Sequence, residues 1–150
     1  MNGVACVDAS LAVKWVVTED DTPSALGFLS QAVETGTRLV GPLHLKAEVT
    51  SAVYRRLRLG ELVAEEARMA VAEFQSISLE LLDLPGLSQR AVELGLQFGW
   101  KHPYDAFYLA LGELLDCQVW TADRKFHGVA APTHPRLNLL SDFSTPDGAS

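Results

Sequence analysis

The sequence lacks several features that mark common protein classes. It has only two cysteines, Cys6 and Cys117, and no Cys-x-x-Cys or zinc-type Cys/His spacing, which excludes structural zinc. No apolar run approaches the ~18 residues of a membrane span, and the first residues do not resemble a signal peptide. No Gly-rich phosphate loop occurs, so no nucleotide cofactor is expected. We therefore expect a cytoplasmic protein without membrane contact, in which both cysteines are buried free thiols.

Positive charge is also scarce. The chain has 12 Lys and Arg against 19 Asp and Glu, and a net charge of −7 at pH 7. This balance counts against a protein that coats nucleic acid, because such proteins neutralise phosphates with dense basic surfaces. It does not exclude an enzyme that acts on nucleic acid through bound cations, since part of the acidity would then belong to the site itself.

The length of 150 residues and the hydrophobic fraction of 48% suit one globular domain. Short apolar runs, rich in β-branched residues, predict strands at residues 4–7, 39–40, 77–82, 118–121 and 137–140. Helical spacing of apolar residues predicts helices at residues 11–17, 22–34, 43–58, 65–75, 87–98 and 103–115. This alternation predicts an α/β protein, a three-layer α/β/α sandwich with a short, mostly parallel sheet. The domain is expected to span residues 1–143, followed by a polar tail at 144–150.

Two acids, Asp8 and Asp123, directly follow predicted strands. Ligands of open α/β sheets bind outside the carboxyl ends of the strands, so these positions suit a functional site. Aspartate is also a favoured helix N-cap. Position alone leaves both interpretations open and favours the cap.

Glu48 lies on or beside the apolar stripe of the helix predicted at 43–58. A charge there is costly unless it is paired, hydrogen-bonded or bound to a metal. The alternatives are a glutamate that reaches solvent or one that pairs with Lys46 or Arg55. His44 is four residues earlier, and without a second histidine nearby it is expected to be a surface or capping residue.

Asp105 stands near the start of the most apolar helix, just after Pro103. In the first turn its charge complements the helix dipole, which is a sufficient structural reason for it. A lone acid at the start of a buried helix is equally typical of a metal ligand. Four clustered carboxylates would repel one another unless cations neutralised them, and Mg²⁺ or Mn²⁺ prefers such oxygen ligands.

Four segments now carry a resemblance: Val7-Asp8-Ala9-Ser10, then Glu48, then Tyr104-Asp105-Ala106-Phe107-Tyr108-Leu109-Ala110-Leu111, then Thr121-Ala122-Asp123-Arg124-Lys125-Phe126. In this order the chain resembles the PIN domain, and within it the VapC-type toxins of bacterial VapBC toxin–antitoxin pairs. The resemblance spans residues 4 to about 140.

The resemblance implies a Mg²⁺- or Mn²⁺-dependent endoribonuclease that cleaves RNA by metal-activated water. Its metal-binding, catalytic residues would be Asp8, Glu48, Asp105 and Asp123, supported through hydrogen bonds by Ser10 and Thr121. It further implies a homodimer and a cognate VapB-type antitoxin, whose C-terminal segment blocks the site and often brings an Arg to the carboxylates. The alternatives are a PIN nuclease of RNA processing and a non-catalytic regulatory module.

Cations available to position RNA are few. Those on one helix or beside the motifs are Lys46, Arg55, Arg56, Arg58, Lys101, Arg124 and Lys125. Such residues usually form a solvated face, but a few beside the site are able to position phosphates.

Overall fold

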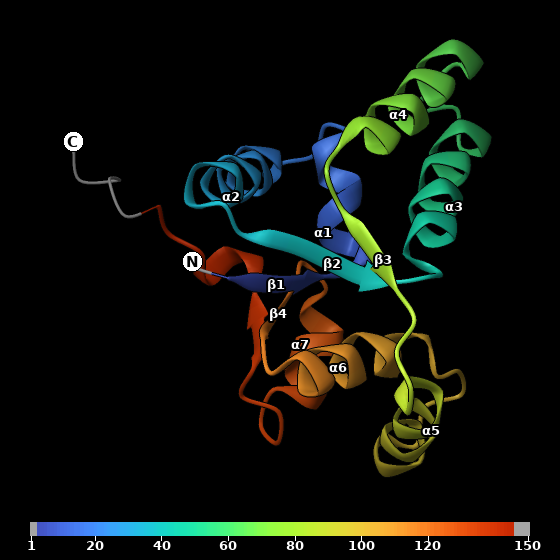
Figure 1. Ribbon diagram of the computed structural model, residues 1–150. Helices are drawn as coiled ribbons and strands as arrows, with labels where there is room; N and C mark the ends of the chain where they lie inside the picture. Colours follow the sequence, from blue (N-terminus) through green and yellow to red (C-terminus); the bar gives the residue numbers. More distant parts are fainter. Residues whose placement is uncertain (1–2, 146–150) are drawn as a thin grey trace.

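The computed structural model describes residues 3–145 and shows a five-stranded sheet between two layers of helices (Figure 1). The strands are β1 (Val4–Val7), β2 (Arg38–Pro42), β3 (Glu80–Leu82), β4 (Gln118–Thr121) and β5 (Leu137–Leu139). Their order across the sheet is β3-β2-β1-β4-β5, and every neighbouring pair is parallel. The predicted α/β/α sandwich is confirmed.

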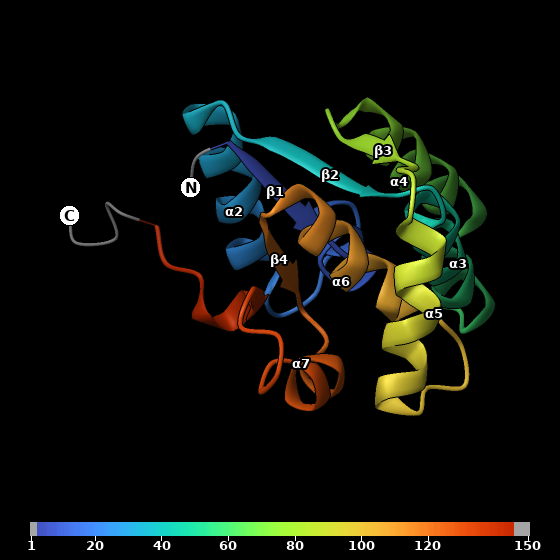
Figure 2. The ribbon, with the colours of Figure 1, turned by 60° about the horizontal axis from the view of Figure 1, so that its bottom comes forward.

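Helices connect successive strands on both faces of the sheet. They are α1 (Ala9–Ala12), the 3₁₀ turn η1 (Val13–Trp15), α2 (Thr22–Thr35), α3 (Leu45–Arg58), α4 (Ala64–Ser76), α5 (Leu87–Phe98), α6 (Tyr104–Leu115), α7 (Arg124–Ala130) and the 3₁₀ turn η2 (Leu140–Asp142). In Figure 1, α1 to α4 lie on one side of the sheet and α5 to α7 on the other. Figure 2 shows α6 across the central strands with α5 beside it.

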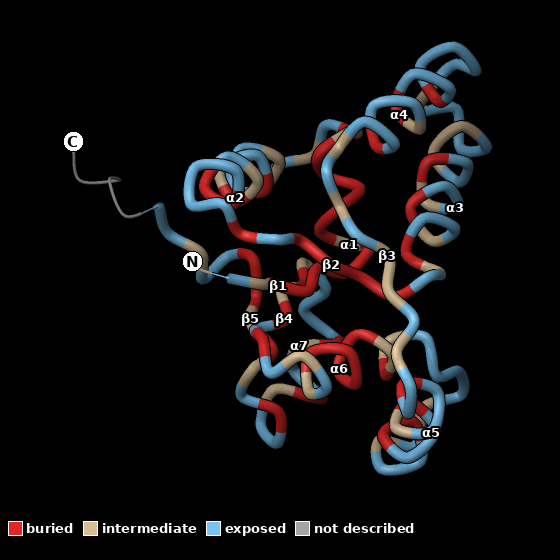
Figure 3. The backbone as a smooth tube through the Cα atoms, in the orientation of Figure 1, coloured by how far each residue is buried: buried red, intermediate tan, exposed pale blue. Residues whose placement is uncertain are grey.

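The core lies around β1 and α6. Cys6 and Val7 of β1 are fully buried, and the central strands form the buried middle of the molecule in Figure 3. Helix α6 is held close to the sheet by Gly112, where an added Cβ would lie 2.3 Å from Cγ2 of Val119. Both cysteines are buried and free, as predicted. None of the helices within residues 3–145 is long and apolar enough to cross a membrane.

Several boundaries differ from the prediction. Helix α7 was not predicted, because only Phe126 and Ala130 of its seven residues are buried and so little apolar periodicity shows. The strand expected at 77–82 is paired only from Glu80 onward, at the edge of the sheet. The helix expected at 11–17 begins at Ala9 and tightens to a 3₁₀ turn. Of the tail predicted at 144–150, residues 146–150 lie outside the described part.

Candidate active site

Four helices begin at the carboxyl ends of the central strands, and each has an acid at its start. Asp8 is the N-cap of α1 and Asp123 the N-cap of α7, while Glu48 and Asp105 lie in the first turns of α3 and α6. Helices α1, α3 and α7 each follow a strand, and α6 runs back before β4. Helix N-termini carry partial positive charge, so this edge of the sheet favours anionic groups.

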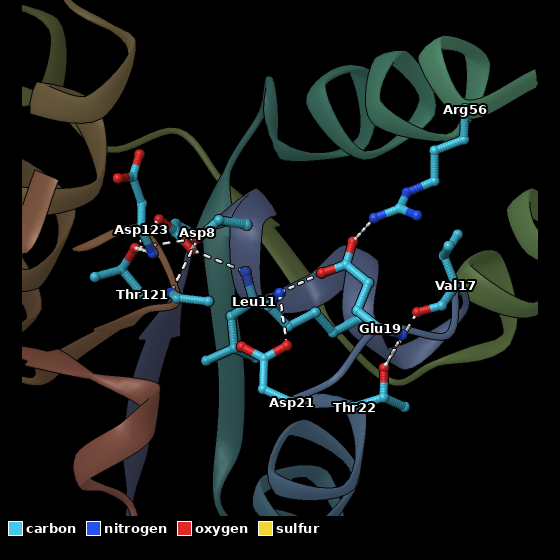
Figure 4. Close-up of polar contacts among 12 residues, drawn as sticks. Asp8, Leu11, Val17, Glu19, Asp21, Thr22, Arg56, Thr121 and Asp123 are labelled. Carbon is cyan, nitrogen blue, oxygen red and sulfur yellow. Dashed lines mark hydrogen bonds and ion pairs between the residues drawn. The ribbon is translucent and has the colours of Figure 1, made fainter. Parts of the chain in front are cut away.

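Asp8 is the most enclosed of the four, with a residue exposure of 4%. Its Oδ1 accepts hydrogen bonds from Ser10 Oγ at 2.7 Å and from the Leu11 amide at 3.1 Å. Its Oδ2 accepts one from the Thr121 hydroxyl (Figure 4). Burial raises the pKa of Asp8 from 3.8 to about 7; the hydrogen bonds oppose this rise, and the charge of Asp105 adds to it.

Ser10 and Thr121 also bind the backbone that leads to Asp123. Ser10 Oγ accepts from the Ala122 amide at 3.0 Å, and Thr121 Oγ1 accepts from the Asp123 amide at 3.0 Å. The two hydroxyl oxygens are 3.1 Å apart. These bonds fix the end of β4 against the start of α1.

Asp123 is exposed and caps α7. Its Oδ1 accepts hydrogen bonds from the amides of Lys125 at 2.9 Å and Phe126 at 3.1 Å. The cap interpretation was therefore right for both Asp8 and Asp123. For Asp123 the capping bonds occupy one oxygen, and Oδ2 takes no hydrogen bond within residues 3–145.

Asp105 is half-buried, and its carboxylate has no hydrogen bond or ion pair within residues 3–145. Burial, together with the charges of Glu48 and Asp123, raises its pKa from 3.8 to about 6, while His44 opposes the rise. Since Asp105 also raises the pKa of Asp8, the four acids form one electrostatic group. The structure therefore brings all four predicted residues to one end of the sheet.

The Glu48 carboxylate pairs neither with Lys46 nor with Arg55, and it does more than face solvent. The Tyr108 hydroxyl donates to its Oε1 at 2.8 Å, and His44 Nε2 lies 3.0 Å from the same oxygen. His44 occupies the N-cap position of α3, as expected, and its carbonyl accepts the Glu48 amide at 3.0 Å. Its side chain makes no cap hydrogen bond and, at 21% exposed, lies against Glu48 instead. The i,i+4 spacing of His44 and Glu48 was the available signal. Tyr108 was missed, although its position three residues after Asp105 places both on one helix face.

The donor chemistry fits a hard divalent cation. Asp105, Glu48 and Asp123 offer carboxylate oxygens without partners in the described chain, and clustered negative charge is what such an ion neutralises. With the side chains as they stand, no group of three or more His, Cys, Asp or Glu residues within 3–145 could hold a metal ion. Binding would therefore require the Asp105 carboxylate, which no hydrogen bond holds within residues 3–145, to turn toward an ion beside the others.

Comparison with known proteins decides the family. The model of the PIN domain matches residues 5–132, most of the chain. The protein belongs to the PIN domain family. No curated protein sequence matches it significantly.

Solved structures share the PIN fold with this chain at low identity. PAE2754 from Pyrobaculum aerophilum superposes with a TM-score of 0.67 at 18% identity, over 94% of this chain and 93% of that one. VapBC2 from Rickettsia felis, bound to a DNA fragment from its promoter, gives 0.63 at 16%, over 91% and 96%. VapC20 of Mycobacterium tuberculosis, a toxin that cleaves the sarcin-ricin loop, gives 0.61 at 16%, over 84% and 95%. These likenesses establish the fold.

Proposed function

We propose that this PIN-domain protein is a Mg²⁺- or Mn²⁺-dependent endoribonuclease and the toxin of a VapBC-type toxin–antitoxin pair. The observation that carries the proposal is the Asp105 carboxylate. It is half-buried, lacks a hydrogen-bond or ion-pair partner among the described residues, and lies within electrostatic reach of Asp8, Glu48 and Asp123. Uncompensated carboxylates of this kind are costly unless a cation joins them.

The four acids have separate tasks in this proposal. Asp105, Glu48 and Asp123 would hold the ion through their free oxygens, and Asp8 would complete the set from the end of β1. Thr121 and Ser10 hold both oxygens of Asp8, which keeps that carboxylate in one orientation. When bound, the ion supplies an activated water and stabilises the leaving oxygen of the phosphodiester.

The rim of the site offers contacts for a single-stranded nucleotide. Tyr104, next to Asp105, is 53% exposed, a suitable platform for an unpaired base. Lys101, Arg124 and Lys125 are exposed and make no ion pair within residues 3–145, so they are free to contact phosphates. The cleavage of an RNA loop by VapC20 supports RNA as the substrate.

A groove beside the site suits an antitoxin segment. A cavity of about 320 Å³ begins at Ser10 and runs between η1 and α3, lined by Lys14, Arg55 and Leu59 among others. We propose that the C-terminal segment of a VapB-type antitoxin lies here and brings an Arg to the carboxylates. The VapBC2 structure supports an antitoxin partner.

A homodimer is proposed as well. It would use the exposed apolar side chains of α3 and α4 and the turn between them, which are Tyr54, Leu59, Val63 and Met69. Such a toxin acts on RNA in the cytoplasm.

The experiment is cleavage of a 5′-labelled structured RNA by the purified protein with Mn²⁺, with Mg²⁺ and with EDTA. We expect cleavage only with a divalent ion. The products should have no 2′,3′-cyclic phosphate, because water rather than the 2′-hydroxyl attacks phosphorus. Cleavage in EDTA, or cyclic-phosphate ends, would contradict the proposal. A small antitoxin gene directly upstream would favour a toxin over an RNA-processing nuclease.

A further inference from the structure

His44 lies between the two helices that bring Glu48 and Asp105 to the site. Its Nε2 is 3.0 Å from Glu48 Oε1 and 3.2 Å from the backbone oxygen of Tyr104, the residue before Asp105. One side chain therefore contacts the start of α3 and the start of α6 through a single nitrogen.

The chemistry of the two neighbours identifies what Nε2 does. The Tyr104 carbonyl is an acceptor, so Nε2 carries a hydrogen and donates it to that oxygen. The same polar nitrogen lies within ion-pair distance of the Glu48 carboxylate. The Tyr108 hydroxyl donates to the same Glu48 oxygen at 2.8 Å. The Tyr108 hydroxyl and His44 Nε2 thus both contact Oε1, and Oε2 of Glu48 takes no hydrogen bond in the described part of the chain.

The imidazole ring is held in place by aromatic neighbours. Its centroid is 5.4 Å from that of Tyr104, 5.2 Å from that of Phe107 and 5.3 Å from that of Tyr108. The ring planes of Phe107 and Tyr108 meet it edge to face, a favoured aromatic arrangement. A ring packed in this way cannot swing freely, so the direction of its N–H is set by α6.

We propose that His44 is a positioning residue that, with Tyr108, fixes Oε1 of Glu48 and so leaves Oε2 for a divalent cation. The inference rests on the proposed metal-dependent function. Partners that orient a ligating carboxylate typically change metal affinity by about 10- to 100-fold when removed.

Two substitutions separate the polar contact of Nε2 with Glu48 from the packing of the ring. His44→Phe keeps an aromatic ring among Tyr104, Phe107 and Tyr108 but has no donor. His44→Gln loses the ring but places an amide N–H near the position of Nε2. The matched control is His102→Phe, because His102 is exposed and its ring lies beside Tyr104 without contact to Glu48.

The measurement is the affinity for Mn²⁺ alone, by calorimetric titration of the purified full chain, with thermal unfolding in EDTA to show that each variant is folded. We expect His44→Phe to bind Mn²⁺ about 10- to 100-fold more weakly than wild type, and His102→Phe to match wild type. His44→Gln should bind within about threefold of wild type.

Each of the other outcomes would contradict either the positioning role of His44 or the proposed metal-dependent function. Wild-type affinity in His44→Phe, or an equal loss in both His44 variants, would show that the ring rather than the donor matters and would overturn the positioning role alone. A wild-type protein that binds no Mn²⁺ would overturn the proposed metal-dependent function together with this inference.

Discussion

The hydroxyl of Thr121 donates a hydrogen bond to Oδ2 of Asp8, which lies 113 residues earlier in the chain. Thr121 ends β4 and Asp8 directly follows the neighbouring parallel strand β1, and the Asp8 amide donates to the Trp120 carbonyl at 3.1 Å beside them. This hydrogen bond connects Asp8, the first of the four acids in the sequence, to β4, the strand that leads to Asp123, the last of them.

Thr121→Val should weaken the site by removing that donor while keeping the shape of the side chain. Thr121 is fully buried, so the lost bond leaves Asp8 Oδ2 and the Asp123 amide without this partner, at a cost of about 1–3 kcal/mol in the free energy of unfolding. Cleavage should also fall, because Asp8 loses its fixed orientation. Chemical denaturation and the RNA assay check both. Thr133→Val, at a hydroxyl that bonds only local groups outside the site, should leave cleavage unchanged.

The stability of the metal-free protein should fall as Asp8 ionises. The folded pKa of Asp8, about 7, lies above the ordinary 3.8. The folded state therefore binds the proton more tightly, so this contribution to stability is fully present below about pH 4 and is lost as the pH rises to about 7, on the order of 4 kcal/mol in all.

The difference in free energy of unfolding between Asp8→Asn and wild type isolates this contribution. Measured in EDTA by denaturation across the same pH range, it should shift in favour of Asp8→Asn as the pH rises. A difference that stays flat with pH would mean that Asp8 is not held in a desolvated site.

Tyr104→Ala should weaken RNA binding if the exposed ring stacks on an unpaired base. A stacking contact contributes about 1–3 kcal/mol, which corresponds to roughly 5- to 150-fold in affinity. The matched control is Tyr104→Phe, because it keeps an aromatic ring at the same position, which is 53% exposed, and should bind like wild type. Fluorescence anisotropy with a labelled RNA in Ca²⁺ measures binding apart from cleavage. Equal losses in the two variants would remove the stacking role.

Glu19 should contribute strongly to folding because it joins two cations from different elements. It pairs with Lys14 of η1 and Arg56 of α3, and its side chain is 19% exposed (Figure 4). Glu19→Gln removes one of two acids from each cation, since Lys14 also pairs with Asp21 and Arg56 with Glu61, and it should lower the free energy of unfolding by about 1–3 kcal/mol. Glu80→Gln breaks the exposed pair with Arg38 and should cost much less, because solvent screens the two charges. Denaturation curves that show equal losses would contradict this ranking.

The sequence predicted those parts of the fold that carry a local pattern. The strand at Val4–Val7 and the helix α5 at Leu87–Phe98 were placed with their observed bounds, since their apolar spacing is unbroken. Helix α7 was missed because it is short and depends on Phe126 and the cap at Asp123 rather than on periodicity.

The sequence partly predicted which residues form the site, but it did not predict their hydrogen-bond partners. The four acids stand after strands or at helix starts, which is visible in the sequence. The hydrogen bond to Glu48 does not follow from the sequence, because its donor Tyr108 lies on another helix, 60 residues later in the chain. The absence of any partner for Asp105 within residues 3–145 is likewise a tertiary property, and no pattern around Asp105 foretells it.

The decisive measurement is the rate of Mn²⁺-dependent RNA cleavage by Asp105→Asn, compared with wild type and with Asp116→Asn. Asp116 is the matched control because its side chain is 96% exposed at the opposite end of α6. We expect at least about a 100-fold loss for Asp105→Asn. Its unfolding temperature in EDTA should be equal to or above that of wild type, because carboxylate repulsion is relieved. Asp116→Asn should cleave at the wild-type rate. Wild-type cleavage by Asp105→Asn, or a loss of activity that merely follows a loss of stability, would contradict a metal-dependent site at these carboxylates.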